Sequence, residues 1–178
     1  EVGCGSGASL VRFIGLGAAP DRLAGIDLMP DRIDAARRLL PQADLRCGSA
    51  HELPYPNGRF DIVAQLTLFS SVVDPALQDA IAAEMLRVVR PGGAILWYDA
   101  DRSRSRPDFV PIPPRRLATL FPGCEIAQRP VTLRWGLIYR LVPLSRFASL
   151  IAQSIPICCS HRAAIIRPSG PPPQEPAA

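Results

Sequence analysis

Short apolar runs alternate with amphipathic segments between residues 1 and 100, and this alternation constrains the fold more than any other feature. Each apolar run has the length of a buried strand, and each amphipathic segment carries apolar residues at helical spacing. The expected strands are 1–4, 23–28, 43–47, 60–69 and 94–100, and the expected helices are 9–16, 31–40 and 76–89. Alternating units of this kind form parallel sheets with right-handed crossovers, so the sequence predicts an α/β fold.

Beyond Asp101 the alternation is looser but it continues. Here we expect helices at 114–121 and 144–155 and strands at 124–133 and 160–168. A chain of 178 residues with 48% apolar side chains can bury one core of this size. We therefore expect a single domain over residues 1–168, with about seven strands and helices on both faces. The proline-rich tail, 169–178, has little to bury and is expected to be disordered.

Charge and cysteine content argue against several classes of protein. The excess of 20 basic over 16 acidic residues is small, and its arginine runs are not interleaved with aromatic residues, so nucleic acid is not an expected partner. The five cysteines show no CxxC spacing and the two histidines lie far apart, so we expect no metal site and free thiols in a reducing cytoplasm. No apolar run reaches about 18 residues, so no membrane span is expected.

Three glycines, Gly3, Gly5 and Gly7, lie between the first expected strand and the first expected helix. Such a turn brings backbone N–H groups close to a ligand at a helix N-terminus. With Ala8, the spacing also fits the fingerprint of nicotinamide-dependent enzymes. Asp27 ends the second strand, where a carboxylate accepts the hydroxyls of a ribose or, alternatively, caps the next helix. These features indicate an adenine nucleoside without saying which one.

Four segments together resemble the class I S-adenosylmethionine-dependent methyltransferases, in particular a methyltransferase type 11 domain. They are EVGCGSG, GIDLMPDRIDAARR, GSAHELPYPNGRFDIVAQLTLF and EMLRVVRPGGAILWYD, in the family's order between residues 1 and 100. The resemblance implies a three-layer Rossmann-like sandwich with a seven-stranded, mostly parallel sheet and a reversed last strand. It also implies a cytoplasmic enzyme that methylates a small molecule, and it makes a nicotinamide-dependent oxidoreductase the weaker alternative.

The resemblance places S-adenosylmethionine along these motifs, from its methionine end to its adenine end. The residues assigned by position are Glu1, Gly3, Cys4, Gly5 and Gly7 for the methionine portion, Asp27 for the ribose, Leu28, Met29, Ser49 and Ala50 for the adenine, and Gln65 beneath the sulfonium.

Two departures from the family pattern bear on activity. Ser49 stands where the family usually has an acidic residue, which replaces a charge-assisted hydrogen bond to the adenine by a neutral one and costs about 1 kcal/mol. The resemblance also implies that this chain is N-terminally truncated, without the start of strand one and the helices that close over the cofactor. A weak or inactive methyltransferase-like adaptor therefore stays open as an alternative.

The acceptor side is less defined by the sequence. Methyl transfer from a sulfonium depends mainly on alignment, and a general base is needed only for some acceptors. The candidate bases are Asp99, Asp101 and His161, each of which also has an ordinary structural interpretation. The apolar insertion 134–159, with its spaced arginines, is interpreted as core packing, a substrate lid or docking face, or a peripheral contact with a membrane surface. The oligomeric state is left open.

Overall fold

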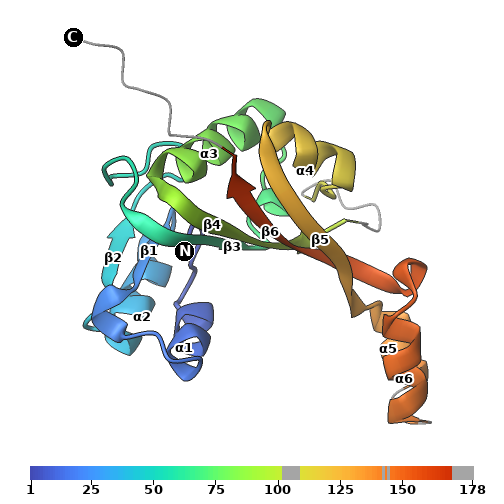
Figure 1. Cartoon of the computed structure of the whole chain (residues 1–178). Coiled ribbons are helices and arrows are strands. Elements are labelled where there is room, and N and C mark those ends of the chain that lie inside the picture. The colour runs from blue at the N-terminus through green and yellow to red at the C-terminus, as the bar shows by residue number, and fades with distance from the viewer. Residues whose placement is uncertain (102–108, 142, 144, 170–178) are drawn as a thin grey trace.

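The computed structural model of the chain describes residues 1–101, 109–141, 143 and 145–169, and almost all of the expected tail lies outside them. Helices and strands alternate along the chain as the sequence predicts (Figure 1). The elements are α1 (Ala8–Gly15), η1 (Pro20–Arg22), β1 (Ala24–Asp27), α2 (Pro30–Leu39), β2 (Asp44–Cys47), β3 (Phe60–Leu66), η2 (Phe69–Ser71), α3 (Pro75–Val88), β4 (Val89–Ala100), α4 (Pro114–Leu120), β5 (Cys124–Leu133), α5 (Trp135–Leu141), α6 (Arg146–Gln153), η3 (Pro156–Cys158) and β6 (Cys159–Pro168).

The strands form two sheets that meet at Val2. The larger sheet has the order β3-β4-β6-β5, in which β6 runs antiparallel to both neighbours, and the smaller is the parallel pair β1-β2. Val2 makes parallel bridges to Ile26 of β1 and to Gln65 of β3. The α/β fold and the reversed last strand are thus confirmed.

A single seven-stranded sheet is not what the structure shows. Of the first expected strand, the structure shows the bridges at Val2, and the extended conformation ends after it because Gly3 adopts a φ of 73°. Other boundaries also differ from prediction: β4 begins at Val89 rather than at 94, and the helix expected at 144–155 is present as the shorter α6. The helix α5, at Trp135–Leu141, was not predicted.

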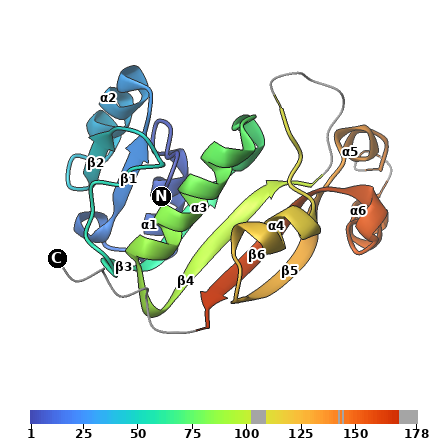
Figure 2. The same cartoon turned by 90° about the horizontal axis from the view of Figure 1, so that it is seen from above.

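Helices cover the strands from two sides, with α1 and α2 on one side and α3 and α4 on the other (Figures 1 and 2). The larger core lies between the main sheet and the helices α3 and α4, and it includes Phe69, Trp97 and Phe121. A smaller core around Leu10 and Ile33 joins α1 and α2 to β1 and β2. No helix in the described ranges is long and apolar enough to cross a membrane.

Candidate functional site

The carboxyl ends of β1, β3 and β4 lie at one edge of the sheets. These strands run parallel, and Val2 joins β1 to β3, so the residues that follow them gather at this edge. The glycine turn follows Val2 and lies at the same edge. Asp27 is the last residue of β1, and Thr67 comes directly after β3. Open α/β sheets bind ligands in the crevice outside their carboxyl strand ends, so this edge is the candidate site.

The three glycines of the turn have positive φ values of 73°, 54° and 85° at Gly3, Gly5 and Gly7. They differ in what surrounds them. A Cβ on Gly7 would lie 3.2 Å from Leu40 Cδ1, so that glycine lets α1 approach α2. Among the described residues, no heavy atom lies within 4 Å of the position of a Gly5 Cβ, beyond its chain neighbours. Gly5 therefore faces open space, as a backbone contact for a ligand requires.

Asp27 connects the glycine turn to the end of β1. Its Oδ2 accepts a hydrogen bond from Gly5 N at 2.8 Å, and its Oδ1 accepts one from Met29 N at 3.0 Å. The second bond closes a turn two residues long just before α2, whose N-cap is Met29 and which has no side-chain cap, so the helix-cap alternative is not confirmed. A carboxylate has about four acceptor positions, and the two bonds leave two for further donors such as hydroxyl groups.

Glu1 places a second carboxylate beside the turn. Its Oε1 accepts a hydrogen bond from the Ser9 hydroxyl. Its Oε2 is buried and has no hydrogen-bond partner within the part of the chain that the structure describes. Burial raises the pKa of Glu1, because the charged form loses its hydration. An unpaired buried carboxylate oxygen is unfavourable, so this position fits a ligand that carries an ammonium group.

The side chains of Cys4 and Gln65 are buried, as that of Asp27 also is. The Cys4 thiol packs in the smaller core against Gly25, and burial raises its pKa to about 11. The Cys4 side chain is therefore not available to a ligand, and its backbone N–H and C=O pair with Ile26 O and Gly7 N at 3.0 Å each. Gln65 is fully buried, with its amide donating to Tyr98 O at 3.4 Å and its carbonyl accepting from Leu68 N at 3.0 Å. One end of the Gln65 side chain thus holds the turn after β3, and the other end contacts β4.

The residues predicted for an adenine ring lie near Asp27. Leu28 and Met29 follow it directly and expose 68% and 46% of their surface, although both are apolar. Gly48 N donates to Asp27 O at 3.0 Å, which keeps Ser49 and Ala50 next to the end of β1. The structure therefore brings the predicted adenine residues together. The Ser49 hydroxyl lies 2.6 Å from His51 Nδ1.

The three candidate bases differ in their surroundings. Asp99 is buried and accepts hydrogen bonds from Ser70 N at 3.2 Å and Ala100 N at 2.8 Å. Burial raises its pKa. Asp101 forms a 2.9 Å ion pair with Arg162, in which both side chains are largely buried. These contacts give Asp99 and Asp101 structural roles.

His161, the third candidate base, lies at the carboxyl end of β4, where it pairs with Ala100. It stacks on Tyr98, with ring centroids 5.0 Å apart and planes within 5°. Its Nδ1 lies 2.9 Å from Ser160 Oγ. Burial lowers the pKa of His161, an effect opposed by the charges of Asp99 and Asp101, so the ring is neutral at pH 7.

Thr67, just after β3, and Thr132, near the end of β5, were not predicted from the sequence. Their φ values are 64° and 61°, which β-branched residues rarely adopt. The Thr132 hydroxyl lies 2.8 Å from the Tyr98 hydroxyl. Backbone strain of this kind is often found at functional sites. No sequence signal could have indicated it, because nothing in the residue type favours a positive φ.

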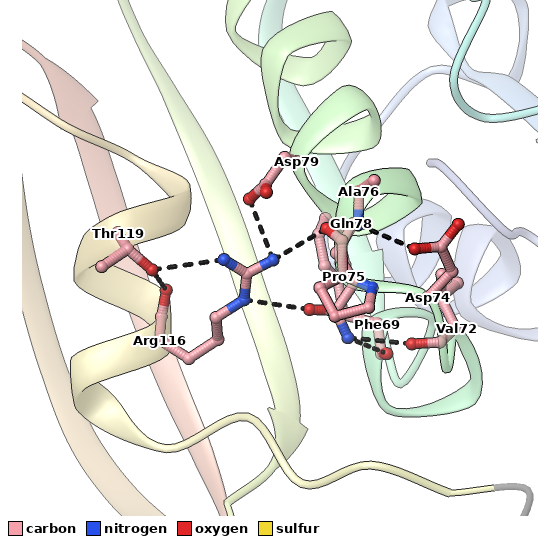
Figure 3. A network of polar contacts seen from close by, with 9 residues as sticks. All are labelled: Phe69, Val72, Asp74, Pro75, Ala76, Gln78, Asp79, Arg116 and Thr119. Carbon is pink, nitrogen blue, oxygen red and sulfur yellow. Dashed lines mark hydrogen bonds and ion pairs between the residues drawn. The ribbon is translucent and has the colours of Figure 1, made fainter.

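The loop between β3 and α3 borders the site. The side chain of Gln78 makes hydrogen bonds to this loop, and that of Arg116 makes one to Gln78 (Figure 3). The buried Gln78 amide donates to Phe69 O at 3.3 Å and to Val72 O at 2.8 Å. Arg116 of α4 donates to Gln78 Oε1 at 3.1 Å and pairs with Asp79 at 2.9 Å. This network fixes the loop relative to α3 and α4.

A pocket of about 770 Å³ lies elsewhere, in the gap between β1 and β3 behind Glu1 and Val2. Its lining includes Phe13 and Val63 but not Gly5 or Asp27. The pocket therefore does not reach Gly5 or Asp27, although Glu1 lines it and also belongs to the crevice at the strand ends.

Comparison with known proteins matches the front of the chain to a family. A family model described as a methyltransferase domain matches residues 1–93, which include the glycine turn and Asp27. An uncharacterized methyltransferase of Schizosaccharomyces pombe is 29% identical over 111 residues, 57% of this chain and 39% of the yeast protein. The chain thus spans well under half the length of that relative.

Solved structures of similar shape include methyltransferases. One, an S-adenosylmethionine-dependent methyltransferase from Archaeoglobus fulgidus, has a TM-score of 0.70 and 15% identity, and the match covers 93% of this chain and 83% of that chain. Another is geranyl diphosphate C-methyltransferase from Streptomyces coelicolor with bound S-adenosyl-L-homocysteine, which has a TM-score of 0.67, 14% identity and coverage of 93% and 67%. At these identities the likeness establishes the α/β methyltransferase-like fold.

Proposed function

This chain belongs to the methyltransferase-domain family, and on that premise we propose that it transfers a methyl group from S-adenosylmethionine to a small-molecule acceptor. S-adenosylmethionine is the cofactor of this family. The observation that carries the proposal is the meeting of two carboxylates, Glu1 and Asp27, with the open backbone at Gly5. We assign the transferase domain to residues 1–168.

The proposed binding mode follows the polar groups along the edge. Glu1 Oε2 accepts the ammonium of the methionine portion, and the turn around Gly5 lies along that portion. The two acceptor positions that remain on Asp27 take the ribose hydroxyls. Leu28 and Met29, whose exposed side chains flank Asp27, pack on the adenine.

The remaining assignments concern the sulfonium end. Ser49 and Ala50 form the edge of the adenine site, and Gln65 supports the turn beneath the reacting group. Bound S-adenosylmethionine supplies an electrophilic methyl group on a sulfonium. The protein's contribution is to align an acceptor with it and to exclude water, because the positive charge disappears during transfer.

His161 is our proposed proton acceptor for acceptors that lose a proton. Its ring is neutral at pH 7, since burial lowers its pKa, and stacking on Tyr98 fixes its orientation. Asp99 and Asp101 act through structure instead, because backbone N–H groups and Arg162 already engage their carboxylates. His161 would act only on an acceptor within hydrogen-bond reach.

Calorimetric titration of the full chain with S-adenosylmethionine tests the binding site. Asp27→Asn is expected to weaken binding by on the order of tenfold, because it removes a charged acceptor from the ribose. The matched control is Asp31→Asn, which changes an exposed carboxylate in the first turn of α2. The proposal is wrong if millimolar cofactor gives no heat with the parent, or if the two variants bind equally.

Transfer is tested separately with isotopically labelled S-adenosylmethionine and a panel of small-molecule acceptors. Labelled product is expected from at least one acceptor, with His161→Gln reducing kcat more than it raises KM for acceptors that lose a proton. Cofactor binding without transfer across the panel would instead support the inactive adaptor.

A further inference from the structure

Exposed apolar side chains concentrate at the end of the molecule that α5, α6 and η3 form. On α6, Phe147, Leu150 and Ile151 lie at helical spacing on one face and are each more than half exposed. The exposed apolar residues of this region, from 46% to 72% accessible, are Tyr139, Phe147, Leu150, Ile151, Ile155 and Ile157. We call residues 134–157 the hairpin tip. Such a concentration marks an interaction surface.

The charge of this part of the chain has one sign. Residues 126–174 contain six arginines and no aspartate or glutamate. Two of these arginines, Arg134 before α5 and Arg140 within it, are exposed at the hairpin tip. The surface therefore combines apolar side chains with positive charge, which complements a partner that is apolar and anionic.

The shape of the hairpin tip favours one such partner. Figures 1 and 2 show α5 and α6 side by side, projecting past the ends of β5 and β6 and away from the other helices. A protein partner would need a groove shaped to receive this projection. The headgroup region of a bilayer deforms around an apolar projection and needs no matching groove.

We propose that the hairpin tip binds the surface of a lipid bilayer that carries anionic headgroups. Phe147, Leu150 and Ile151 enter the boundary between headgroups and acyl chains, and Arg134 and Arg140 contact lipid phosphates. Because β6 runs antiparallel to both β4 and β5, β5 is parallel to β4. The hairpin tip follows the carboxyl end of β5 and therefore projects from the edge of the sheet that carries the candidate site. Binding in this way places that edge next to the membrane surface.

Vesicle flotation with the full chain tests this proposal. The probes are vesicles of phosphatidylcholine alone and of phosphatidylcholine with 30% phosphatidylserine. The parent is expected to float with the anionic vesicles, and the triple variant Phe147→Ser, Leu150→Ser, Ile151→Ser to bind on the order of tenfold more weakly. The matched control replaces Leu16, Leu39 and Ile62 by serine, three exposed apolar residues away from the tip and from the carboxyl ends of the strands, and should float like the parent.

A second pair of variants tests the charges. Arg134→Gln with Arg140→Gln is expected to weaken binding to anionic vesicles by about fivefold for each arginine, and to do so less at high salt. Arg12→Gln with Arg38→Gln, on the exposed faces of α1 and α2, is the control. Equal flotation of the parent and both tip variants, or of the parent with neutral and anionic vesicles, overturns the proposal.

Two further measurements separate this outcome from others. Self-association in analytical ultracentrifugation that the triple variant abolishes, without vesicle binding by the parent, would identify a second copy of the chain as the occupant and overturn the proposal. Circular dichroism and calorimetric binding of S-adenosylmethionine should match the parent in every tip variant. The proposed methyl transfer can therefore fail without affecting this result.

Discussion

The geometry of the glycine-turn unit, which comprises the turn, α1, α2, β1 and β2, is determined differently from that of the main sheet, β3-β4-β6-β5. The glycine-turn unit has strands of four residues, a small core, and a shape set by positive φ values and by the two bonds to Asp27. The main sheet has three strands of 10 or 12 residues and a large aromatic core. Backbone conformation thus shapes the proposed cofactor side, whereas side-chain packing shapes the proposed acceptor side.

The largest expected effect comes from the core of the main sheet. Trp97 lies between Phe69 and Phe121, at ring distances of 4.5 and 5.8 Å, and it is almost fully buried. Trp97→Ala should lower the free energy of unfolding by about 3–5 kcal/mol in urea denaturation. The comparison change in the smaller core, Ile33→Val, should cost about 1 kcal/mol. Equal losses would show that the two regions do not differ in this way.

The next effect concerns the buried ion pair that joins the end of β4 to β6. Arg162→Met removes the guanidinium that the Asp101 carboxylate contacts at 2.9 Å and should cost about 3 kcal/mol in the same measurement. The double variant Asp101→Leu with Arg162→Met should recover part of this loss, since it removes both charges of the buried ion pair. A double variant no more stable than Arg162→Met would contradict this account of the pair.

Substitutions of Gly7 and Gly5 should affect the free energy of unfolding and cofactor binding to different extents. Gly7→Ala should lower the free energy of unfolding by about 1–2 kcal/mol, because the new Cβ adds strain at positive φ and approaches Leu40. Gly5→Ala carries the same conformational strain without that contact, so it should destabilise less and weaken cofactor binding more. Denaturation and calorimetry on both variants check this order. The reverse order would argue against a ligand beside Gly5.

The smallest expected effect is a pH dependence from His161. Burial lowers its pKa below 6.5 in the folded state, so the unfolded state binds the proton more readily. The stability that the neutral ring contributes is present above about pH 6.5 and is lost as the pH falls towards the folded pKa. Between pH 7 and pH 5, the parent should therefore lose more stability than His161→Gln.

The control for this pH series is His51→Gln, because His51 is exposed. That variant should follow the parent across the range. The charges of Asp99 and Asp101 act on His161, so the difference between curves reports His161 together with its coupling to these two carboxylates. Identical slopes for the parent and His161→Gln would mean that the ring titrates alike in the folded and unfolded states.

The regular elements were largely predictable where local pattern decides structure. The strand at 124–133 has the predicted bounds, and α2 is shifted by one residue from the predicted range. The start of β4 was not predictable, because Val89 joins the strand only by pairing with Phe60 across a register shift. The helix expected at 144–155 is present as α6, whereas α5 was not predicted.

The candidate site divides in the same way. The glycine turn and Asp27 were found from the sequence, because their spacing carries the chemistry of a nucleoside site. The hydrogen bonds by which Gln78 and Arg116 fix the loop after β3 could not be predicted from the sequence, since Gln78 and Arg116 are 38 positions apart. The same is true of the stacking of Tyr98 on His161.

By itself, the sequence determined the α/β class, the family and the cofactor, because glycine spacing, apolar period and motif order are local and leave few alternatives. Only the tertiary structure decided that Asp27 serves both the turn and the start of α2, that Asp101 is paired with Arg162, and that the hairpin tip is exposed. Burial and partner choice depend on which distant segments the fold brings together, and the hydrophobic pattern along the chain does not specify those pairings one by one.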